Sequence, residues 1–345
     1  MPAPFPWHER CGKRVLQTCR HTLDGMSHHT LMLAAQAAAA VPDMQLVKTA
    51  QFDLPGVRSA LAWDADGQAW VIEVPESDEA ESKQRDRVSG AQAIGEGLRS
   101  RLPFAAPRVI GTTTVEGRTL SVGAYLPGVR IRQDKITPDM ASAVGQAIAQ
   151  LHSIPASTLY DQGRPVHSAT DSMRKATSIV DRAAKTTLLP KNLLRRWEAA
   201  YEDRDLWQFE PTIIHGALHL GAFLTEGVTI TAVTGWRELA VGDPARDVAW
   251  FTTPHVAQRL EPAKTAYLDN RQDADQRIFQ RARFWAELDI ARWLLHGIDS
   301  RNEQIVDEAT QLINELHDRI SGDMESDLTE PITENPHPLS DTSES

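Results

Sequence analysis

The residues with the clearest capacity for chemistry lie between positions 211 and 250, in the segment PTIIHGALHLGAFLTEGVTITAVTGWRELAVGDPARDVAW. His215 and His219 in this segment have the i, i+4 spacing of two zinc ligands on one face of a helix. Gly216 and Gly221 disfavour a helix at this place, and no candidate third ligand lies nearby in the sequence. We therefore interpret both histidines as packing residues of a loop, and we predict no metal site.

The elements around this loop are short. Residues 212–214 are apolar, residues 223–224 and 228–233 are typical of a hairpin, and the breaker-rich GDPARD is expected to open a helix. A loop held between strands is a common place for catalytic and binding residues.

This stretch resembles the catalytic core of the aminoglycoside and macrolide phosphotransferases, which are relatives of the protein kinases. In that family a His-Gly-Asp-Leu-His loop, an Asn three residues later, a short strand ending Ile-Asp-Trp and a Gly-Asp-Pro-x-x-Asp segment follow in this order and at this spacing. The matching positions here are His215, Gly216, Leu218, His219, Gly221, Trp236, Gly242, Asp243, Pro244 and Asp247. The resemblance covers about residues 26–320 and implies a two-lobed α+β fold similar to that of the protein kinases.

Three positions of this core depart from the family pattern. The catalytic Asp of the loop falls on Ala217, the magnesium-binding Asn on Ala222, and the magnesium-binding Asp before Trp on Gly235. In phosphoryl transfer the loop Asp accepts the proton of the attacking hydroxyl, and the other two groups hold the magnesium ion at the phosphates. A methyl group accepts no proton and binds no metal. The resemblance therefore predicts a site without its base and its metal ligands.

Asp243 and Asp247 could be mistaken for a catalytic carboxylate pair. In the family this segment buttresses the catalytic loop, and Asp243 before Pro244 also suits a helix N-cap. We interpret both as structural. The expected frame of the site consists of His215, Gly216, His219, Trp236, Asp243 and Asp247.

The region before YLPG is expected to form a kinase-like N-terminal lobe. Residues 57–63 and 68–74 flank DADG and predict a β-hairpin. A polar segment at 75–87, a helix at about 88–100 and a further strand pair are expected to follow. No glycine-rich phosphate loop precedes the hairpin, because residues 44–56 contain only Gly56.

The strand position that carries the phosphate-contacting Lys or Arg in the family is Glu73. A carboxylate there repels a triphosphate, and one unit-charge contact near 4 Å is worth roughly 4 kcal/mol at an effective dielectric of 20. Nucleotide binding in the usual pose should therefore be weak. Alternatively, the strand register differs and Glu73 is an exposed charge at the edge of the sheet. Gln92 or Glu96 is expected at the place of the helix-borne Glu that pairs with the family's cation.

The second half of the chain is predicted to be mainly helical. Thr137 and Pro138 begin a helix, and His152 is expected to be a polar residue at its end. Two or three helical segments are expected between 172 and 204, and amphipathic helices at 273–298 and 303–320.

The composition is ordinary for a globular protein, with 41% hydrophobic and 24% charged residues. No apolar run approaches the ~20 residues that span a bilayer, and no basic patch with interleaved aromatic residues indicates nucleic-acid binding. We expect a cytoplasmic protein with no membrane or nucleic-acid partner. Cys11 and Cys19 are interpreted as incidental thiols.

Both ends are expected to lie outside the fold. Residues 1–25 are expected to be either a short disordered leader or the result of a mis-assigned start, in which case Met26 is the true first residue in place of Met1. Of the net charge of −11, residues 318–345 carry eight acidic residues and one arginine, so 321–345 is expected to be a disordered acidic tail. The predicted lobes are 26–127 and 128–320, with the degenerate catalytic loop at 213–247.

Three functions remain open from the sequence. The first is a pseudokinase, with binding or scaffolding as its role, no cofactor, and a small molecule or a protein as its partner. The second is an ATP- and magnesium-dependent phosphotransferase acting on a hydroxylated, macrolide-like small molecule with relocated catalytic groups, for which Glu226 and Glu238 are the nearest spare carboxylates. The third is a small-molecule binder that keeps the substrate cleft and has lost the nucleotide half.

Overall fold

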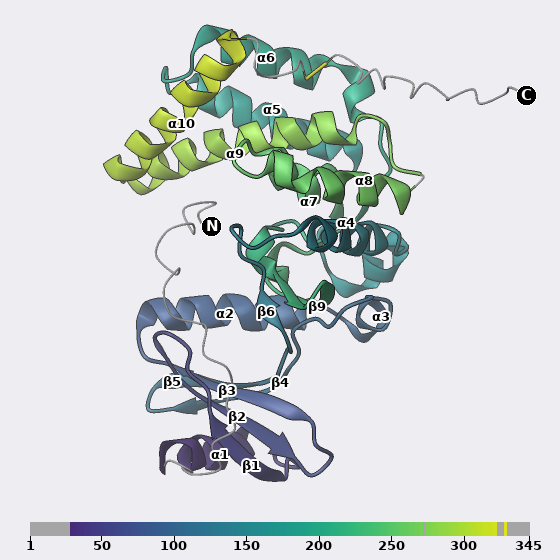
Figure 1. Ribbon diagram of the computed structural model, residues 1–345. Coiled ribbons are helices and arrows are strands. Elements are labelled where there is room, and N and C mark those ends of the chain that lie inside the picture. Colours follow the sequence, from purple (N-terminus) through teal and green to yellow (C-terminus); the bar gives the residue numbers. More distant parts are fainter. Residues whose placement is uncertain (1–27, 272, 323–327, 330–345) are drawn as a thin grey trace, which may run out of the picture.

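The computed structural model describes residues 28–271, 273–322 and 328–329 (Figure 1). A small lobe built on a sheet lies beside a larger, mainly helical lobe, which confirms the predicted two-lobed α+β fold. The leader at 1–25, with its two cysteines, lies outside the described residues. Within those residues, no helix combines the length and the apolar character needed to cross a membrane.

The small lobe contains a five-stranded antiparallel sheet in the order β1-β2-β3-β5-β4. Its strands are β1 (Leu46–Gln51), β2 (Val57–Asp64), β3 (Ala69–Pro75), β4 (Val109–Val115) and β5 (Arg118–Ala124). The predicted hairpin is β2 and β3, paired from Val57 opposite Pro75 to Trp63 opposite Ala69. The sequence did not predict β1, because no residue of that strand is fully buried and the alternation of buried and exposed positions is missing.

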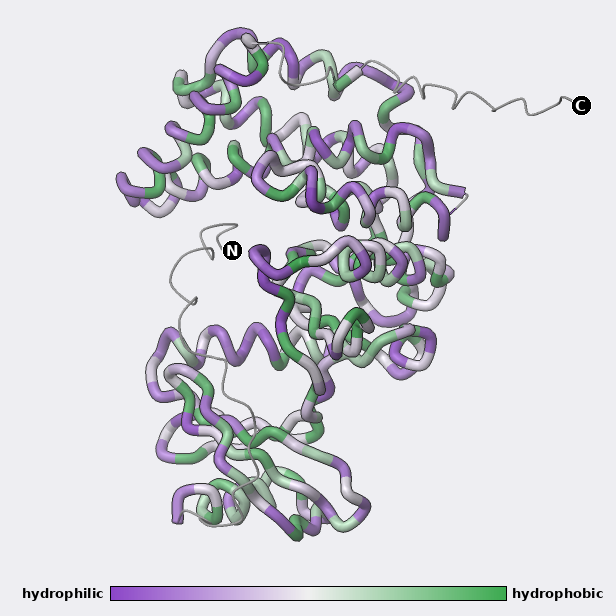
Figure 2. Tube along the Cα trace, in the orientation of Figure 1, coloured by the Kyte–Doolittle hydropathy of each residue, from purple (hydrophilic) through white to green (hydrophobic). Residues whose placement is uncertain are grey.

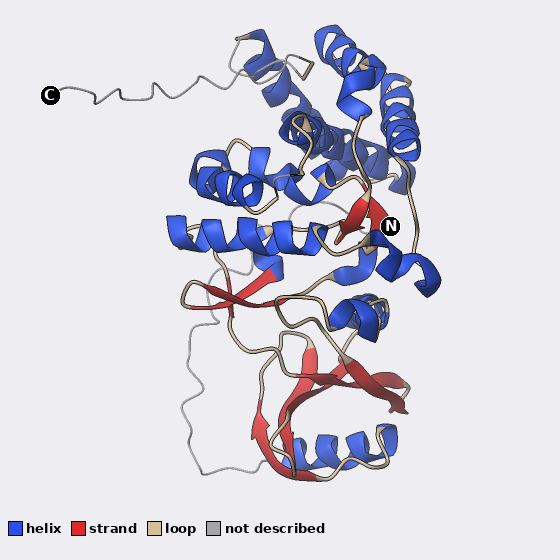
Figure 3. Cartoon of the chain, turned by 90° about the vertical axis from the view of Figure 1, so that its right-hand side faces the viewer, coloured by secondary structure: helices blue, strands red, loops and turns tan. Residues whose placement is uncertain are grey.

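The two faces of this sheet differ in polarity, and one helix covers each (Figure 3). The apolar face packs on α1 (His28–Ala40), in a cluster that includes Leu33, Ala37, Ile72, Val74, Leu120 and Val122. Side chains alternate along a strand, so Glu73 and Ser121 point to the opposite face. There the amide of Gln84, from α2 (Asp78–Gln92), donates to Ser121 Oγ at 2.9 Å and to the carbonyl of Glu73 at 3.1 Å.

The helix α2 corrects the sequence prediction of a polar segment at 75–87 followed by a helix at 88–100. The helix begins after Ser77, whose hydroxyl accepts the N–H of Ala80, and ends at Gln92. A separate short helix, α3 (Glu96–Arg99), follows. Most of α2 is hydrophilic (Figure 2), so its apolar period is too weak to reveal where it begins.

The chain leaves the sheet at Ala124 and enters the large lobe at β6 (Val129–Arg130), which pairs with β8 (Phe223–Glu226). β8 forms the predicted hairpin with β9 (Thr229–Val233). A second small ribbon joins β7 (Thr212–Ile214) to β10 (Ala240–Gly242). The loop at residues 215–222 therefore connects the β7–β10 ribbon to the β8–β9 hairpin.

Seven helices are described in the large lobe: α4 (Pro138–His152), α5 (Ala169–Ala184), α6 (Lys191–Glu202), α7 (Ala245–Val248), α8 (Glu261–Asp269), α9 (Ile278–Ser300) and α10 (Glu303–Ser321). The predicted start of α4 is correct, since the hydroxyl of Thr137 accepts the N–H of Met140 at 3.2 Å. The lobe has one large apolar core, with Trp197, Trp236 and Trp285 among its largest buried side chains. That core makes the β7–loop–β8 segment part of a rigid lobe.

The predicted tail at 321–345 lies mostly outside the described residues. Four of its residues are described: Ser321 and Gly322 end α10, and Leu328 and Thr329 contact the fold. Leu328 is fully buried in the core of the large lobe, and the carbonyl of Thr329 accepts a hydrogen bond from Arg277 at 2.8 Å. At these two positions the chain is therefore packed against the lobe.

Candidate functional site

Asp247 supports the start of the loop from the interior of the large lobe. Its two oxygens accept the backbone N–H groups of His215 and Gly216, each at 2.7 Å, and its Oδ2 lies 3.2 Å from His152 Nε2. Burial alone would raise the pKa of Asp247, but the hydrogen bond from His152 and the backbone N–H of Gly216 outweigh burial and lower it. The carboxylate is thus an ionised, fully buried support for the start of the loop.

His152 does more than end a helix, which corrects the sequence interpretation. The side chain is buried, and its Nδ1 lies 2.9 Å from the hydroxyl of Tyr267. Burial lowers the pKa of His152, so the ring is neutral near pH 7 and donates from Nε2 to the ionised Asp247. Tyr267 then donates to Nδ1 while accepting from Arg271 Nη1 at 3.2 Å. Partners 95 and 115 residues away in the chain leave no local signal of this network.

The two histidines of the loop have different environments. His215 is completely buried, its Nε2 lies 3.0 Å from the carbonyl of Thr234, and its ring centre is 4.7 Å from that of Trp236. Burial lowers the pKa of His215, so this ring is neutral as well. His219 is exposed and precedes a short 3-10 turn, Leu220–Ala222, in place of a helix. The i, i+4 spacing therefore does not bring the rings together as ligands.

At Gly216 the loop closely approaches the end of the 3-10 turn Trp236–Glu238. Its φ of 83° lies in the left-handed region, and a Cβ there would come within 2.5 Å of the carbonyl oxygen of Glu238. A side chain would therefore be strained and would clash. The frame of the site requires glycine at this position.

Asp243 is the second buried carboxylate of the frame. It accepts from Arg281 Nε and Nη2 at 3.1 Å, from the indole of Trp285 at 2.8 Å, and from the backbone of Ala245 at 3.0 Å. The bond to Ala245 is a capping interaction at the start of α7, although the cap residue itself is Pro244. Groups of the protein therefore occupy both oxygens of the Asp243 carboxylate with hydrogen bonds.

The three substituted positions lie on the loop and on the strand end beside it. Ala217 is exposed, Ala222 is 2% exposed, and Gly235 has a φ of 94°. Thr234 donates to the carbonyl of Ala222 from its N–H at 2.9 Å and from its hydroxyl at 3.1 Å. The structure thus places the second and third positions side by side, with no carboxylate or amide on either.

A cation lies next to these two positions. The guanidinium of Arg130, on β6, donates to the carbonyl of Gly221 and to the hydroxyl of Thr234, the latter at 3.3 Å. These two acceptors directly precede Ala222 and Gly235 in the chain. Arg130 could not be singled out from the sequence, because its partners are 91 and 104 residues away.

In the small lobe, Glu73 forms an ion pair with Arg87 of α2 at 2.8 Å. This contact corrects the expectation that Gln92 or Glu96 would hold the partner position. Gln92 is exposed at the end of α2, and Glu96 belongs to α3. Protein kinases pair a strand Lys with a helix Glu, whereas here the strand carries the acid and the helix the base.

The helix α2 is also fixed to the segment that follows Gly235. Asp86 pairs with Arg237 at 2.8 Å. A Cβ on Gly90 would lie 3.1 Å from the backbone nitrogen of Arg237, so the helix backbone approaches this segment closely. The two lobes are therefore joined directly beside the substituted positions.

The structure separates the two spare carboxylates. Glu226 pairs with Thr229 at the far end of the β8–β9 hairpin, about 10 Å along the strand from Phe223 and hence from Ala222. That position does not bring it to the loop. Glu238 lies against Gly216 and lines a small cavity there. Within the described ranges, no group of three or more His, Cys, Asp or Glu side chains has the arrangement of a metal site.

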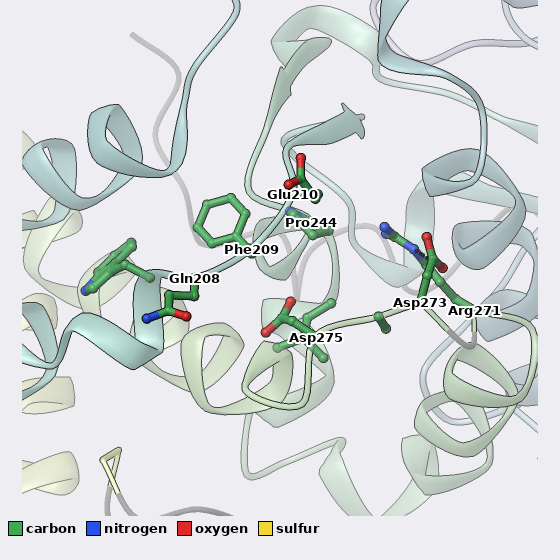
Figure 4. Close-up of a pocket in the computed structure, with 10 residues that line it drawn as sticks. Gln208, Phe209, Glu210, Pro244, Arg271, Asp273 and Asp275 are labelled. Carbon is green, nitrogen blue, oxygen red and sulfur yellow. Dashed lines mark hydrogen bonds and ion pairs between the residues drawn. The ribbon is translucent and has the colours of Figure 1, made fainter.

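A larger cavity, of about 450 Å³, opens elsewhere in the large lobe (Figure 4). Its lining consists of Trp207, Gln208, Phe209, Glu210, Pro244, Arg271, Asp273, Ala274, Asp275 and Ile278. Asp273 and Asp275 are paired with Arg271 and Arg281, at 3.3 and 2.7 Å. Its volume is within the roughly 300–1,000 Å³ of drug-sized ligand pockets, but the substituted positions are not part of its lining.

Comparison with known proteins agrees with this architecture. Residues 58–294 match the model of the phosphotransferase enzyme family, APH. The macrolide 2'-phosphotransferase MphH from Brachybacterium faecium, as apoenzyme, is similar with a TM-score of 0.61 and 21% identity, over 82% of this chain and 98% of that one. A macrolide 2'-phosphotransferase type I gives 0.58 and 23%, over 82% and 94%.

An aminoglycoside phosphotransferase, solved as the GDP and kanamycin complex of APH(2")-IIIa, gives a TM-score of 0.60 and 17% identity, over 83% of this chain and 98% of that one. At these identities the structures show a shared fold. No curated protein matches the sequence. The family model spans more than half of the chain, and the protein therefore belongs to the APH phosphotransferase enzyme family.

Proposed function

We propose that this protein is a pseudokinase of the phosphotransferase family, which binds a small molecule or a protein and does not transfer phosphate. The observation that carries the proposal is the side-by-side position of Ala222 and Gly235, with Ala217 exposed on the same loop. These side chains supply no base and no metal ligand. A positioned base is typically worth about 10²–10⁴ in rate, and the metal ligands supply much of the electrostatic stabilisation.

The residues present do not fit a magnesium–nucleotide complex. The donor set of the metal site is a methyl group and a glycine, and the Arg130 guanidinium already places a positive charge beside them. In the small lobe, Glu73 presents a carboxylate on the face of the sheet that is covered by α2, and Arg87 is engaged with it. Both halves of the usual triphosphate site are thus altered in charge.

A thermal-shift titration of the full chain tests the proposal. Magnesium-ATP should give no stabilisation beyond that of magnesium alone. Ala217→Asp should restore no ATP turnover, because a base without a metal has no polarised phosphate to serve. Ala217→Asn is the matched control of similar size without a base, and it should behave identically.

The alternative is an active phosphotransferase with a relocated base. Glu238 is the carboxylate that favours it, because its backbone and Cβ lie against Gly216 in the loop. ATP turnover that survives repurification and disappears in Glu238→Gln, but not in Glu226→Gln, would replace the pseudokinase proposal with this one.

A further inference from the structure

A second cavity, of about 110 Å³, lies between the start of α5, the β7–β10 ribbon, α7 and α9. We call it the basic cavity, after the charged and titratable groups that line it: Arg164, His167, Lys175, Arg237, Glu238 and Arg246. Its volume is well below the roughly 300–1,000 Å³ of drug-sized pockets, and corresponds to about four water molecules at 30 Å³ each. The space suits one small polar group.

Two of the other lining residues are carboxylates that accept hydrogen bonds within the fold. Asp243 is held by Trp285 and by Arg281, whose charge it shares with Asp275. Asp171 accepts the N–H and hydroxyl of Ser168 in a capping box and lies 3.5 Å from Arg174. Of the three acids at the cavity, Glu238 is the one for which no ion pair is found in the described part of the chain.

Lining cations outnumber this remaining carboxylate. Arg237 is paired with Asp86, and Arg164 donates to the carbonyls of Leu239 and Arg237 at 3.0 and 3.1 Å, which leaves its charge uncompensated. The Arg246 guanidinium lies over the ring of Trp285 at 4.8 Å, and its buried Nη1 has no hydrogen-bond partner among the described residues. An aromatic face stabilises a cation but does not cancel its charge.

Lys175 is the third cation without an ion pair in the described part of the chain. It reaches solvent, yet the protein atoms and charges around it disfavour the ammonium form. Burial, followed by the charges of Arg246 and Arg292, lowers the pKa of Lys175 to about 8. Glu238 and Asp289 oppose this shift without cancelling it. Among the charges near Lys175, those of the two arginines therefore outweigh those of the two carboxylates.

We propose that the basic cavity is an oxyanion site that takes the phosphate group of a small molecule. Arg164, Lys175 and Arg246 face Glu238 and the partly compensated Asp243, which leaves an excess of about one to two positive charges. A phosphate monoester carries about −1.5 to −2 near pH 7. Arginine and lysine donors match the oxygens of such a group. Burial and the charge of Lys175 lower the pKa of His167, so its neutral ring adds an N–H donor.

This inference is independent of the proposed loss of phosphate transfer. The site contains none of the substituted positions, and it binds an anion without magnesium. Binding to phosphate in the presence of a metal chelator would therefore occur whether or not the protein turns over ATP.

The test is a titration of the full chain with inorganic phosphate in a metal chelator, by calorimetry and by thermal shift, with acetate and chloride at matched ionic strength. Phosphate should bind saturably and raise the melting temperature more than either control. Lys175→Gln and Arg246→Met should each weaken phosphate binding about tenfold to a hundredfold, the range for one lost charge-assisted hydrogen bond. Lys185→Gln removes the same charge from an exposed position on the end of α5 and should change nothing.

Arg246→Met provides a second readout. Removing an unpaired, buried cation should raise the melting temperature of the phosphate-free protein while removing its response to phosphate. Equal shifts with phosphate and chloride at matched ionic strength would overturn the proposal. Undiminished phosphate binding in Lys175→Gln would overturn it too, even if Arg246→Met did not fold. Equal affinity for acetate would replace the phosphate group by a carboxylate and would likewise refute the proposal.

Discussion

The support beneath the loop and the exposed side of the same loop differ sharply. Beneath it, Asp247 and Asp243 accept hydrogen bonds with nearly every lone pair, from both the backbone and distant side chains. On the exposed side, Ala217 offers a methyl group. The contrast shows that the buried carboxylates support the loop through groups that do not include the side chain of position 217.

The largest effect should come from breaking the support. Asp247→Ala removes the acceptor of two backbone N–H groups and of His152, and leaves buried donors unsatisfied. We expect a loss of about 3–5 kcal/mol in the free energy of unfolding, measured by urea denaturation. Glu226→Ala, at the exposed hairpin end, is the control and should stay within about 0.5 kcal/mol. Similar values for the two variants would contradict the structural role of Asp247.

Acid should weaken the same support. Burial holds the pKa of His152 and His215 below the ordinary 6.5, so the unfolded chain binds more protons than the native protein below that pH. Stability should fall as the pH drops below 6.5, by up to about 1.4 kcal/mol per pH unit for each histidine. Asp247, whose pKa is also lowered, adds a further loss below its ordinary 3.8.

Urea denaturation at pH 7, 6 and 5 measures this dependence. His215→Gln should flatten the slope by the contribution of one histidine. An unchanged slope in this variant would mean that His215 titrates normally in the folded protein.

Gly216, at the turn of the loop, tests the close packing of the loop through the addition of one carbon atom, a Cβ. Gly216→Ala adds a Cβ within 2.5 Å of the Glu238 carbonyl at a φ of 83°, and should cost about 2–3 kcal/mol. Gly227→Ala, at a φ of 62° with nothing within 4 Å, carries only the backbone strain and should cost about 1–2 kcal/mol. If both variants lost the same amount in chemical denaturation, close packing at Gly216 would be disproved.

The smallest effect is expected in the small lobe, at the ion pair of Glu73 and Arg87. The pair is partly exposed, so a double-mutant cycle with Glu73→Gln and Arg87→Gln should give a coupling of about 0.5–1 kcal/mol. The exchange Glu73→Arg with Arg87→Glu should recover most of the stability of the native pair. Coupling of zero would show that the inverted pair has no structural role.

The sequence predicts the lobe order, the β2–β3 and β8–β9 hairpins and the start of α4, because each has a local pattern of apolar residues, turns or caps. It does not reveal α2, whose contacts are polar: Gln84, Asp86 and Arg87 anchor it to the sheet and to the other lobe. A helix without an apolar stripe gives periodicity analysis little to detect.

The site divides in the same way. The resemblance to the family pattern predicts the substituted positions from the matching residues around them. Three further residues contact the site or its frame: Arg87, Arg130 and His152. Tertiary structure alone brings them to their partners. Nothing within a few residues of each indicates its partner, so only coordinates could supply these contacts.

Arg130 has one more consequence. A divalent metal ion binds reversibly, so the occupancy of its site depends on the free ion concentration. A chelator can remove the ion. A guanidinium on β6 is covalently tethered, so its effective concentration at Gly221 and Thr234 is set by the backbone and not by the medium. The positive charge beside Gly221 and Thr234 should therefore be the same at low and at high magnesium concentration.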